Sequence, residues 1–268
     1  MNRRNFLRLI GLTTGATAAT SSLNAFNIGG VNVPVPLPTE ITGGVNVDKV
    51  AEGSQKIAKG ATGIGAKEEA AIGEAVAIGI IGKNGGLARA SGPAQKIIYI
   101  GKSLAKYSYR PGLNFRFGVL NSSIVNGFSS PGGYVFITKG LLDAVGNDDQ
   151  LAGVLAHEIC HITRRHALQT ISRGQLVSGI VDVASGSSSD FSAFDAGTDK
   201  IVNKLLDTGF DPDDEYDADK FGAKLAYETG YSKNGLKDFL EKLKSTQGDS
   251  KKIFSTHPPL SNRISKLS

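Results

Sequence analysis

The chain has 268 residues, of which 40% are hydrophobic, enough for one large folded core or two small ones. This composition excludes wholesale disorder, collagen-like repeats and coiled coils, and the sequence contains no apolar run long enough to span a membrane. The formal net charge is +5, but Arg3, Arg4 and Arg8 all precede the first acidic residue, Glu40. The excess outside that stretch is small, so we expect no nucleic-acid partner.

Residues 1–25 have the composition of an export signal, with a basic start, a mildly apolar middle and a run of small residues. The twin arginines Arg3 and Arg4 resemble those of the twin-arginine translocation signal. An amphipathic helix of the fold is the alternative, but the apolar residues here show no helical period. We therefore expect a periplasmic protein, in which residues 26–48 form a Pro- and Gly-rich linker or an edge hairpin.

Residues 49–110 favour helices, since apolar positions recur three and four apart between several glycines. The Gly- and Ile-rich stretch 70–82 predicts close helix packing, with peripheral membrane contact as the alternative. Residues 113–119 then alternate between apolar and polar, and residues 134–138 form a second candidate strand. The segment between them, NGFSSPGG, is rich in turn-forming residues. Strands beside helices predict an α+β domain over residues 49–268.

The sequence HEICH, residues 157–161, lies in a helix that begins after the capping residue Asn147. His157 and His161 are one turn apart on the same helix face, so both imidazoles can bind one metal ion. Glu158 lies beside this pair, where it can take a proton from a water molecule at the metal. Two of only four histidines in the chain fall in this motif. We therefore expect a metal centre with a general base.

A candidate third ligand lies in the acidic segment DPDDEYDAD, which begins a second helix at Asp211 and Pro212. Glu215 and Asp219 are one turn apart on it. If Glu215 completes a His/His/Glu zinc site, Asp219 can hydrogen-bond the far nitrogen of a ligating histidine and hold its tautomer. The alternative is an acidic first turn on a solvated helix.

Three further features receive simpler interpretations. The first metal helix is expected to continue to about Leu168, so His166 points away from His157 and is a surface or helix-end histidine. Cys160, the single cysteine, is expected to be a small buried residue rather than a redox switch. The Ser/Gly-rich stretch 174–199 is either a mobile flap over the cleft or a short helix with a loop.

In the order of its motifs the chain resembles the gluzincin metallopeptidases that include HtpX-type heat-shock proteases, the CAAX prenyl endopeptidase and periplasmic BepA/LoiP-like proteases. The resemblance covers roughly residues 50–268 and rests on HEICH, EYDAD, NGFSSPGGYVFITKGLL and THPPLSNRI. Gly127 departs from the family, which often has alanine after the equivalent of Asn126.

The resemblance implies a mainly helical zincin-like domain with a small antiparallel β-sheet whose edge strand borders the active-site cleft. It implies one Zn²⁺ per chain, held by His157, His161 and Glu215, with Glu158 as general base. The edge strand, within residues 126–137, would pair with an extended peptide. The residues expected to contact substrate are Asn126, Gly133, Tyr134, Val135 and Arg263.

The roles of two of these residues, His257 and Arg263, are left open by the sequence. His257, in THPP, could stabilise the oxyanion as a catalytic residue, cover the metal's open position, or fix a Pro-rich turn before a final helix capped by Ser261. Arg263 could be an ion-pair residue or contact a substrate carbonyl.

These expectations add up to an exported zinc endopeptidase. Its polypeptide substrates, unfolded or misassembled envelope proteins, are implied by the resemblance alone. The competing hypothesis is a non-catalytic, zinc-containing chaperone or assembly factor for envelope proteins. The intact Glu158 argues against it, because a structural zinc site needs no base.

Overall fold

The computed structural model describes residues 25–28, 31–34, 64–89, 92–173, 191–248 and 257–267. The chain divides into two units, Met1–Glu52 and Gly53–Ser268. In the first unit, β1 (Ala25–Ile28) and β2 (Val31–Pro34) form an antiparallel hairpin. The expected export signal, apart from its last residue, lies outside the described residues. So does the expected flap as far as residue 190.

The second unit contains a three-stranded sheet in the order β3-β5-β4. Its strands are β3 (Arg116–Leu120), β4 (Gly127–Ser130) and β5 (Tyr134–Thr138). β4 and β5 are antiparallel, but β3 and β5 are parallel, so the sheet is mixed and not wholly antiparallel as expected. The reason is the path of the chain, which passes from β3 to the far edge before it returns through the hairpin. The fold class, α+β, is confirmed.

The turn-rich segment NGFSSPGG contains both β4 and the turn that follows it. Gly132 and Gly133 have φ values of 76° and 99°, which glycine adopts without strain, and this allows the tight return into β5. The turn-forming residues of the segment predicted the turn, but the same residues gave no sign of the strand that precedes it.

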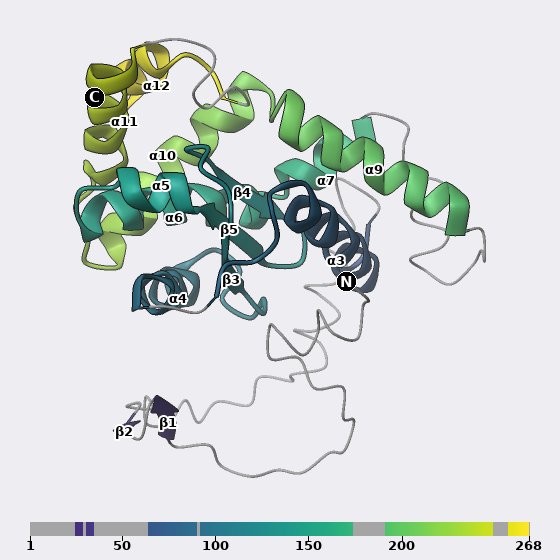
Figure 1. The fold of residues 1–268 in the computed structure, drawn as a ribbon, viewed down its shortest axis with the longest axis horizontal. Helices are drawn as coiled ribbons and strands as arrows, with labels where there is room; N and C mark the ends of the chain where they lie inside the picture. The colour runs from purple at the N-terminus through teal and green to yellow at the C-terminus, as the bar shows by residue number, and fades with distance from the viewer. Residues whose placement is uncertain are drawn as a thin grey trace, which may run out of the picture. The chain divides into compact units, whose positions relative to one another are not determined.

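The helices lie on several sides of the sheet and pack against one another (Figure 1). They are α3 (Ala66–Lys83), α4 (Gly92–Tyr107), α5 (Lys139–Ala144), α6 (Asp148–Thr163), α7 (His166–Arg173), α9 (Phe191–Asp207), α10 (Pro212–Glu228), α11 (Gly235–Gln247) and α12 (Leu260–Lys266). None of the helices within the described residues is both long and apolar enough to cross a membrane. The last helix begins after Pro259, two residues before the expected cap Ser261.

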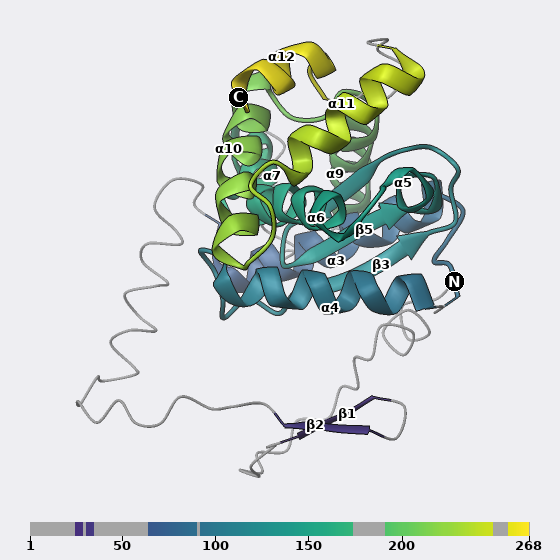
Figure 2. The ribbon, with the colours of Figure 1, turned by 90° about the vertical axis from the view of Figure 1, so that its left-hand side faces the viewer.

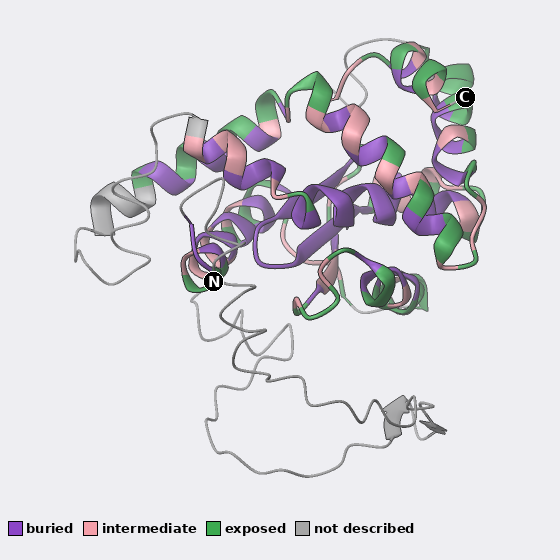
Figure 3. Ribbon diagram, turned by 180° about the vertical axis from the view of Figure 1, so that it is seen from behind, coloured by how far each residue is buried: buried purple, intermediate pink, exposed green. Residues whose placement is uncertain are grey.

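Helix α6 is the centre of the second unit, packed against α4, α10, α11 and two strands (Figure 2). Its N-cap is Asn147, whose side chain accepts a hydrogen bond from the Gln150 amide at 2.9 Å. Every residue from Gln150 to Thr163 is buried, which Figure 3 shows as a continuous purple helix. Burial raises the pKa of Cys160 to about 12, so its thiol stays protonated.

Helix α3 packs against the β4–β5 turn and against α9. A Cβ at Gly73 would lie 1.8 Å from the carbonyl oxygen of Pro131, so only glycine permits this approach. Ile72, Val76 and Ile80 of the same helix are buried in the core. A Cβ at Gly79 would lie 2.6 Å from Val202, so Gly73 and Gly79 serve close packing, as expected, whereas a Cβ at Gly82 would meet nothing within 4 Å.

Helix α6 ends at Thr163, five residues before the expected end. Arg165 has a φ of 63°, which interrupts the helix, and its guanidinium donates to the Ile64 carbonyl at 2.7 Å. The same guanidinium lies 3.2 Å from the buried Glu69 carboxylate. Arg110 donates to both oxygens of Glu69, at 2.6 and 3.1 Å. This three-residue ion cluster joins α3 to the C-terminal end of α6.

Candidate metal centre

Helices α6 and α10 bring together three side chains with metal-binding atoms. The Nε2 atoms of His157 and His161 are 3.0 Å apart. The Glu215 carboxylate lies 3.5 Å from the first, through Oε2, and 3.6 Å from the second, through Oε1. All three side chains are buried, and they are the one such cluster among the described residues.

This trio fits a zinc ion. Ligand atoms about 2.0–2.2 Å from a tetrahedral zinc lie roughly 3.3 Å from one another, close to the separations found here. Glu215 Oε1 is fully buried and accepts no hydrogen bond from the part of the chain that the structure describes. A cation would compensate this buried acceptor. Burial also lowers the pKa of His161 well below its usual value, which keeps the imidazole neutral, as a metal ligand must be.

A carboxylate and a guanidinium orient the first histidine. Asp219 Oδ1 lies 2.9 Å from His157 Nδ1. Arg263 in turn donates to both oxygens of Asp219, at 2.9 and 2.6 Å. Burial acts to raise the pKa of Asp219, but the Arg263 charge outweighs it and holds the pKa well below its usual range. Asp219 is therefore an anion that accepts the Nδ1 proton of His157 and leaves Nε2 free to face Glu215.

Glu158 shares a small cavity with Glu215. The cavity measures about 20 Å³, room for about one water molecule, and strand β4 lines one of its sides. A Cβ at Gly127 would lie 2.6 Å from Glu158 Oε1, so the carboxylate lies directly against the strand. Burial raises the pKa of Glu158 to about 7, against the opposing effects of His157 and the Ser129 hydroxyl. The group therefore changes protonation near neutral pH.

His257 also lines this cavity. Its Nδ1 atom is 2.5 Å from Glu215 Oε2, and its ring centre is 5.6 Å from that of His157. Burial, followed by the Arg263 charge, lowers the pKa of His257 to about 3, so the ring is neutral. The THPP segment therefore contacts the candidate ligand Glu215, although it lies more than forty residues after it in the chain.

The residues expected to contact substrate have different surroundings. Asn126 precedes β4, and its Oδ1 accepts a hydrogen bond from the Gly127 amide at 3.1 Å. Gly133 lies in the hairpin turn, and Tyr134 and Val135 lie on β5, whose two edges are taken by β3 and β4. In this sheet the outer strands are β3 and β4, and β4 is the one that lines the cavity. Arg263 is 1% exposed and pairs with Asp219. This arrangement corresponds to the ion-pair role and not to a contact with a substrate carbonyl.

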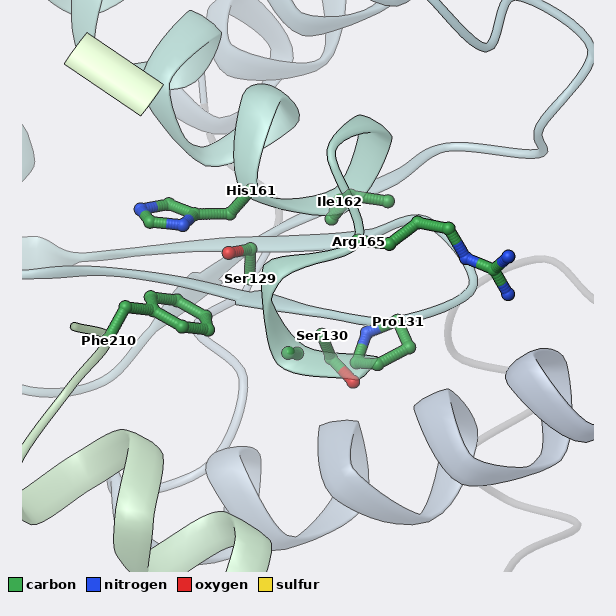
Figure 4. Close-up of a pocket in the computed structure, with 8 residues that line it drawn as sticks. Ser129, Ser130, Pro131, His161, Ile162, Arg165 and Phe210 are labelled. Carbon is green, nitrogen blue, oxygen red and sulfur yellow. The ribbon is translucent and has the colours of Figure 1, made fainter. Parts of the chain in front are cut away.

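Three further residues reach this centre without being expected there. The ring of Phe210 stacks on His161, with centroids 4.1 Å apart and planes 18° apart. Figure 4 shows both rings, with Ser129, at one end of a neighbouring pocket whose other end holds Arg165. The other two are His166 and Asp217, which lie in contact with each other. The sequence shows no local signal for Phe210 beyond its place before the helix cap Asp211.

His166 was expected to point away from His157 as a surface or helix-end histidine; it does stand at a helix end, as the first residue of α7, but it is neither at the surface nor turned away from the candidate ligands. The residue is 3% exposed, and its Nδ1 atom lies 2.9 Å from Nδ1 of His161. His166 would point away from His157 only if α6 continued past residue 163. Because the helix stops and α7 starts at His166, the ring turns back towards the candidate metal ligands.

Comparison with known proteins identifies the family of the chain. The sequence profile of peptidase family M48 matches residues 92–268. The mitochondrial metalloendopeptidase OMA1 of Schizosaccharomyces pombe is 32% identical over 161 residues, covering 58% of this chain and 46% of the relative. Metalloprotease YcaL of Escherichia coli is 30% identical over 183 residues, covering 65% of this chain and 71% of the relative.

The β-barrel assembly-enhancing protease of Escherichia coli is 28% identical over 180 residues, covering 63% of this chain and 37% of the relative. The chain therefore spans less than half the length of this protease and of the OMA1 relative. The resemblance to metallopeptidases drawn from HEICH, EYDAD and the neighbouring segments is confirmed. With a match to the family profile over more than half of its residues, the chain belongs to peptidase family M48.

Proposed function

We propose that the protein is a zinc-dependent endopeptidase that hydrolyses peptide bonds in unfolded or misassembled proteins. The observation that carries the proposal is the convergence of His157, His161 and Glu215 on one buried point, with Glu158 beside Glu215 in one cavity. The family and the relatives' names, a metalloendopeptidase, a metalloprotease and an assembly-enhancing protease, support the reaction class.

A zinc ion held by the three residues would supply Lewis-acid chemistry for the attack of water on a peptide carbonyl. Glu158 acts as the general base, accepting a proton from the attacking water and returning it to the leaving amine. Burial raises its pKa to about 7 in the metal-free protein, so the carboxylate is a stronger base than an exposed one. Asp219 holds His157 in the tautomer that presents Nε2.

Strand β4 is the proposed docking edge for the substrate. An extended peptide that pairs with Gly127–Ser130 would be held by backbone hydrogen bonds, which make few demands on side-chain identity. That property suits a protease of unfolded proteins. The peptide would then lie beside Glu158, which contacts the same strand at Gly127.

His257 is proposed to cover the centre in the resting protein. Its contact with Glu215 and its place in the cavity wall support this role over that of a remote turn histidine. The cavity, with room for about one water molecule, admits no peptide in this conformation. Substrate entry therefore requires residues that line the cavity, His257 among them, to move apart.

We further propose that the protein is exported to the periplasm by the twin-arginine route. The proposal rests on the composition of residues 1–25 and on the paired Arg3 and Arg4. Replacing both arginines with lysine should leave the protein in the cytoplasmic fraction, whereas a Sec-dependent signal would tolerate the change. Cell fractionation and blotting distinguish these outcomes.

The central test compares wild type with Glu158→Gln for zinc content and for cleavage of casein. We expect about one zinc per chain in both proteins and cleavage only by wild type, because glutamine cannot accept the proton. Glu68→Gln, the same change on helix α3, is the matched control and should cleave normally. If both proteins hold zinc and neither cleaves any unfolded protein, His257→Ala separates a protease whose centre stays covered from the chaperone hypothesis. Cleavage by that variant retains the enzyme, and its absence favours the chaperone.

A further inference from the structure

The second candidate ligand, His161, contacts another histidine on its far side. While its Nε2 faces His157 and Glu215, its Nδ1 lies 2.9 Å from Nδ1 of His166. Both rings are buried, and Phe210 packs against both, with its ring centre 4.1 Å from that of His161 and 6.2 Å from that of His166. A neutral imidazole has one donor and one acceptor nitrogen, so one of the two Nδ1 atoms donates and the other accepts.

The other nitrogen of His166 determines which atom donates. His166 Nε2 is 3.2 Å from Oδ2 of Asp217, a carboxylate that also accepts two hydrogen bonds from Arg164, at 2.5 and 2.8 Å. An ionised carboxylate only accepts, so His166 donates from Nε2, and in its neutral form Nδ1 is then the acceptor. His161 must then donate from Nδ1, which leaves the lone pair of its Nε2 for a metal ion.

We propose that His166, backed by Asp217, is a positioning residue that holds His161 in its metal-binding tautomer and orientation. The inference rests on the proposed function, since it assumes that His161 is a metal ligand. Helix α10 would then support both histidines as well as carrying Glu215. Its Asp219 orients His157 directly, and its Asp217 orients His161 through the imidazole of His166. In both series of contacts the aspartate pairs with an arginine: Asp219 with Arg263, and Asp217 with Arg164. We call the second series, from Arg164 through Asp217 and His166 to His161, the relay.

The relay explains two residues that otherwise have no role at the centre. Asp217 lies about 200° around the helix from Glu215, so it cannot reach the metal position directly. It can reach His166 because α7 begins where the chain turns back after Arg165. Asp214 Oδ1 lies 3.9 Å from the same His166 nitrogen, beyond hydrogen-bond distance.

The test compares His166→Phe with His166→Asn. Phenylalanine keeps the ring but removes the acceptor, whereas asparagine Oδ1 can occupy the position of Nδ1. Zinc affinity is measured by competition with a chelator, and the geometry of the site by the visible spectrum of the cobalt-loaded protein. We expect about 10–100-fold weaker zinc binding and an altered spectrum for His166→Phe, with recovery to within a few-fold of wild type for His166→Asn.

A packing role would give a different result. If His166→Phe binds zinc as tightly as wild type with the same cobalt spectrum, or if His166→Asn is as weak as His166→Phe, the proposal is wrong. Unfolding of each metal-free variant reports whether it folds. Should His166→Phe fail to fold, Asp217→Asn is compared with Asp214→Asn, and equal zinc affinities in that pair overturn the relay.

The same measurements separate this inference from the proposed function. If wild type binds no zinc, or if His157→Ala binds it as tightly as wild type, the metal centre itself is wrong. If His157→Ala abolishes binding while the His166 and Asp217 variants match wild type, the metal centre stands and only the relay fails.

Discussion

Gly222 of α10 lies directly against the backbone of His157 on α6. A Cβ at residue 222 would lie 2.9 Å from the His157 amide nitrogen and 3.0 Å from its Cα. These neighbours are main-chain atoms of a buried helix, so they cannot move aside as the end of a flexible side chain can. The absence of a side chain at Gly222 therefore sets how closely the two helices that carry the candidate ligands approach.

Gly222→Ala is expected to separate α10 from α6 and to move Glu215 away from the two histidines. The added methyl should cost about 1–3 kcal/mol of unfolding free energy through overpacking. Zinc affinity should fall by at least about tenfold because ligand geometry is lost. Gly82→Ala is the control: its Cβ would meet nothing within 4 Å, so stability should stay the same or rise, with zinc binding unchanged. Equal zinc affinities in the two variants would refute the argument.

The geometry within each metal helix was predictable because it is local. Spacings of four residues place His157 with His161, and Glu215 with Asp219, whatever the rest of the chain does. Contacts between distant segments have no such signal. Phe210 and His257 reach the centre through the packing of whole helices and loops, and only the family resemblance directed attention to His257.

Two of the departures from expectation, the side of His166 and the direction of β3, have the same kind of origin. A helical wheel predicts the side of His166 only while the helix continues, and the φ of 63° at Arg165 ends it. Alternation of apolar residues identifies β3 and β5 as strands but carries no information about their direction relative to each other. Both features depend on tertiary contacts, such as that of Arg165 with Glu69.

Arg263→Met is expected to destabilise the metal-free protein by about 3–5 kcal/mol, since it leaves the buried Asp219 carboxylate without its cation. Denaturant unfolding in the presence of EDTA measures this cost. The double variant Arg263→Met with Asp219→Asn should recover part of the loss, because no charge is then left uncompensated. A double variant less stable than Arg263→Met would show that the ion pair is not the cause.

Glu69→Gln should weaken the cluster that holds the C-terminal end of α6. Glu69 is 1% exposed and pairs with Arg110 and Arg165, so neutralising it leaves two guanidinium groups without their anion, at a cost of about 3–5 kcal/mol. Glu68→Gln, one residue earlier and partly exposed, should change the unfolding free energy by less than about 0.5 kcal/mol. Comparable losses in both variants would contradict a specific role for the cluster.

Removal of the metal should reveal a pH dependence that originates in Glu215. Burial raises the pKa of this carboxyl to about 7 from 4.5, so the folded protein holds the proton more tightly than the unfolded chain. Its stabilising contribution is therefore complete below about pH 4.5 and is lost as the pH rises through 7. His161 and His257, whose pKa values burial lowers, act in the opposite direction, so the comparison must be made with Glu215→Gln.

In EDTA, wild type should lose stability relative to Glu215→Gln as the pH is raised from 5 to 8, which thermal or denaturant unfolding at each pH can follow. With zinc, the stability of wild type relative to Glu215→Gln should instead rise with pH. The reason is that the ion binds the deprotonated carboxylate, so its stabilising effect grows with pH. Glu215→Gln should gain little from zinc at any pH. A constant difference between the two metal-free proteins across this range would show that the Glu215 carboxyl is not protonated in the folded, metal-free state.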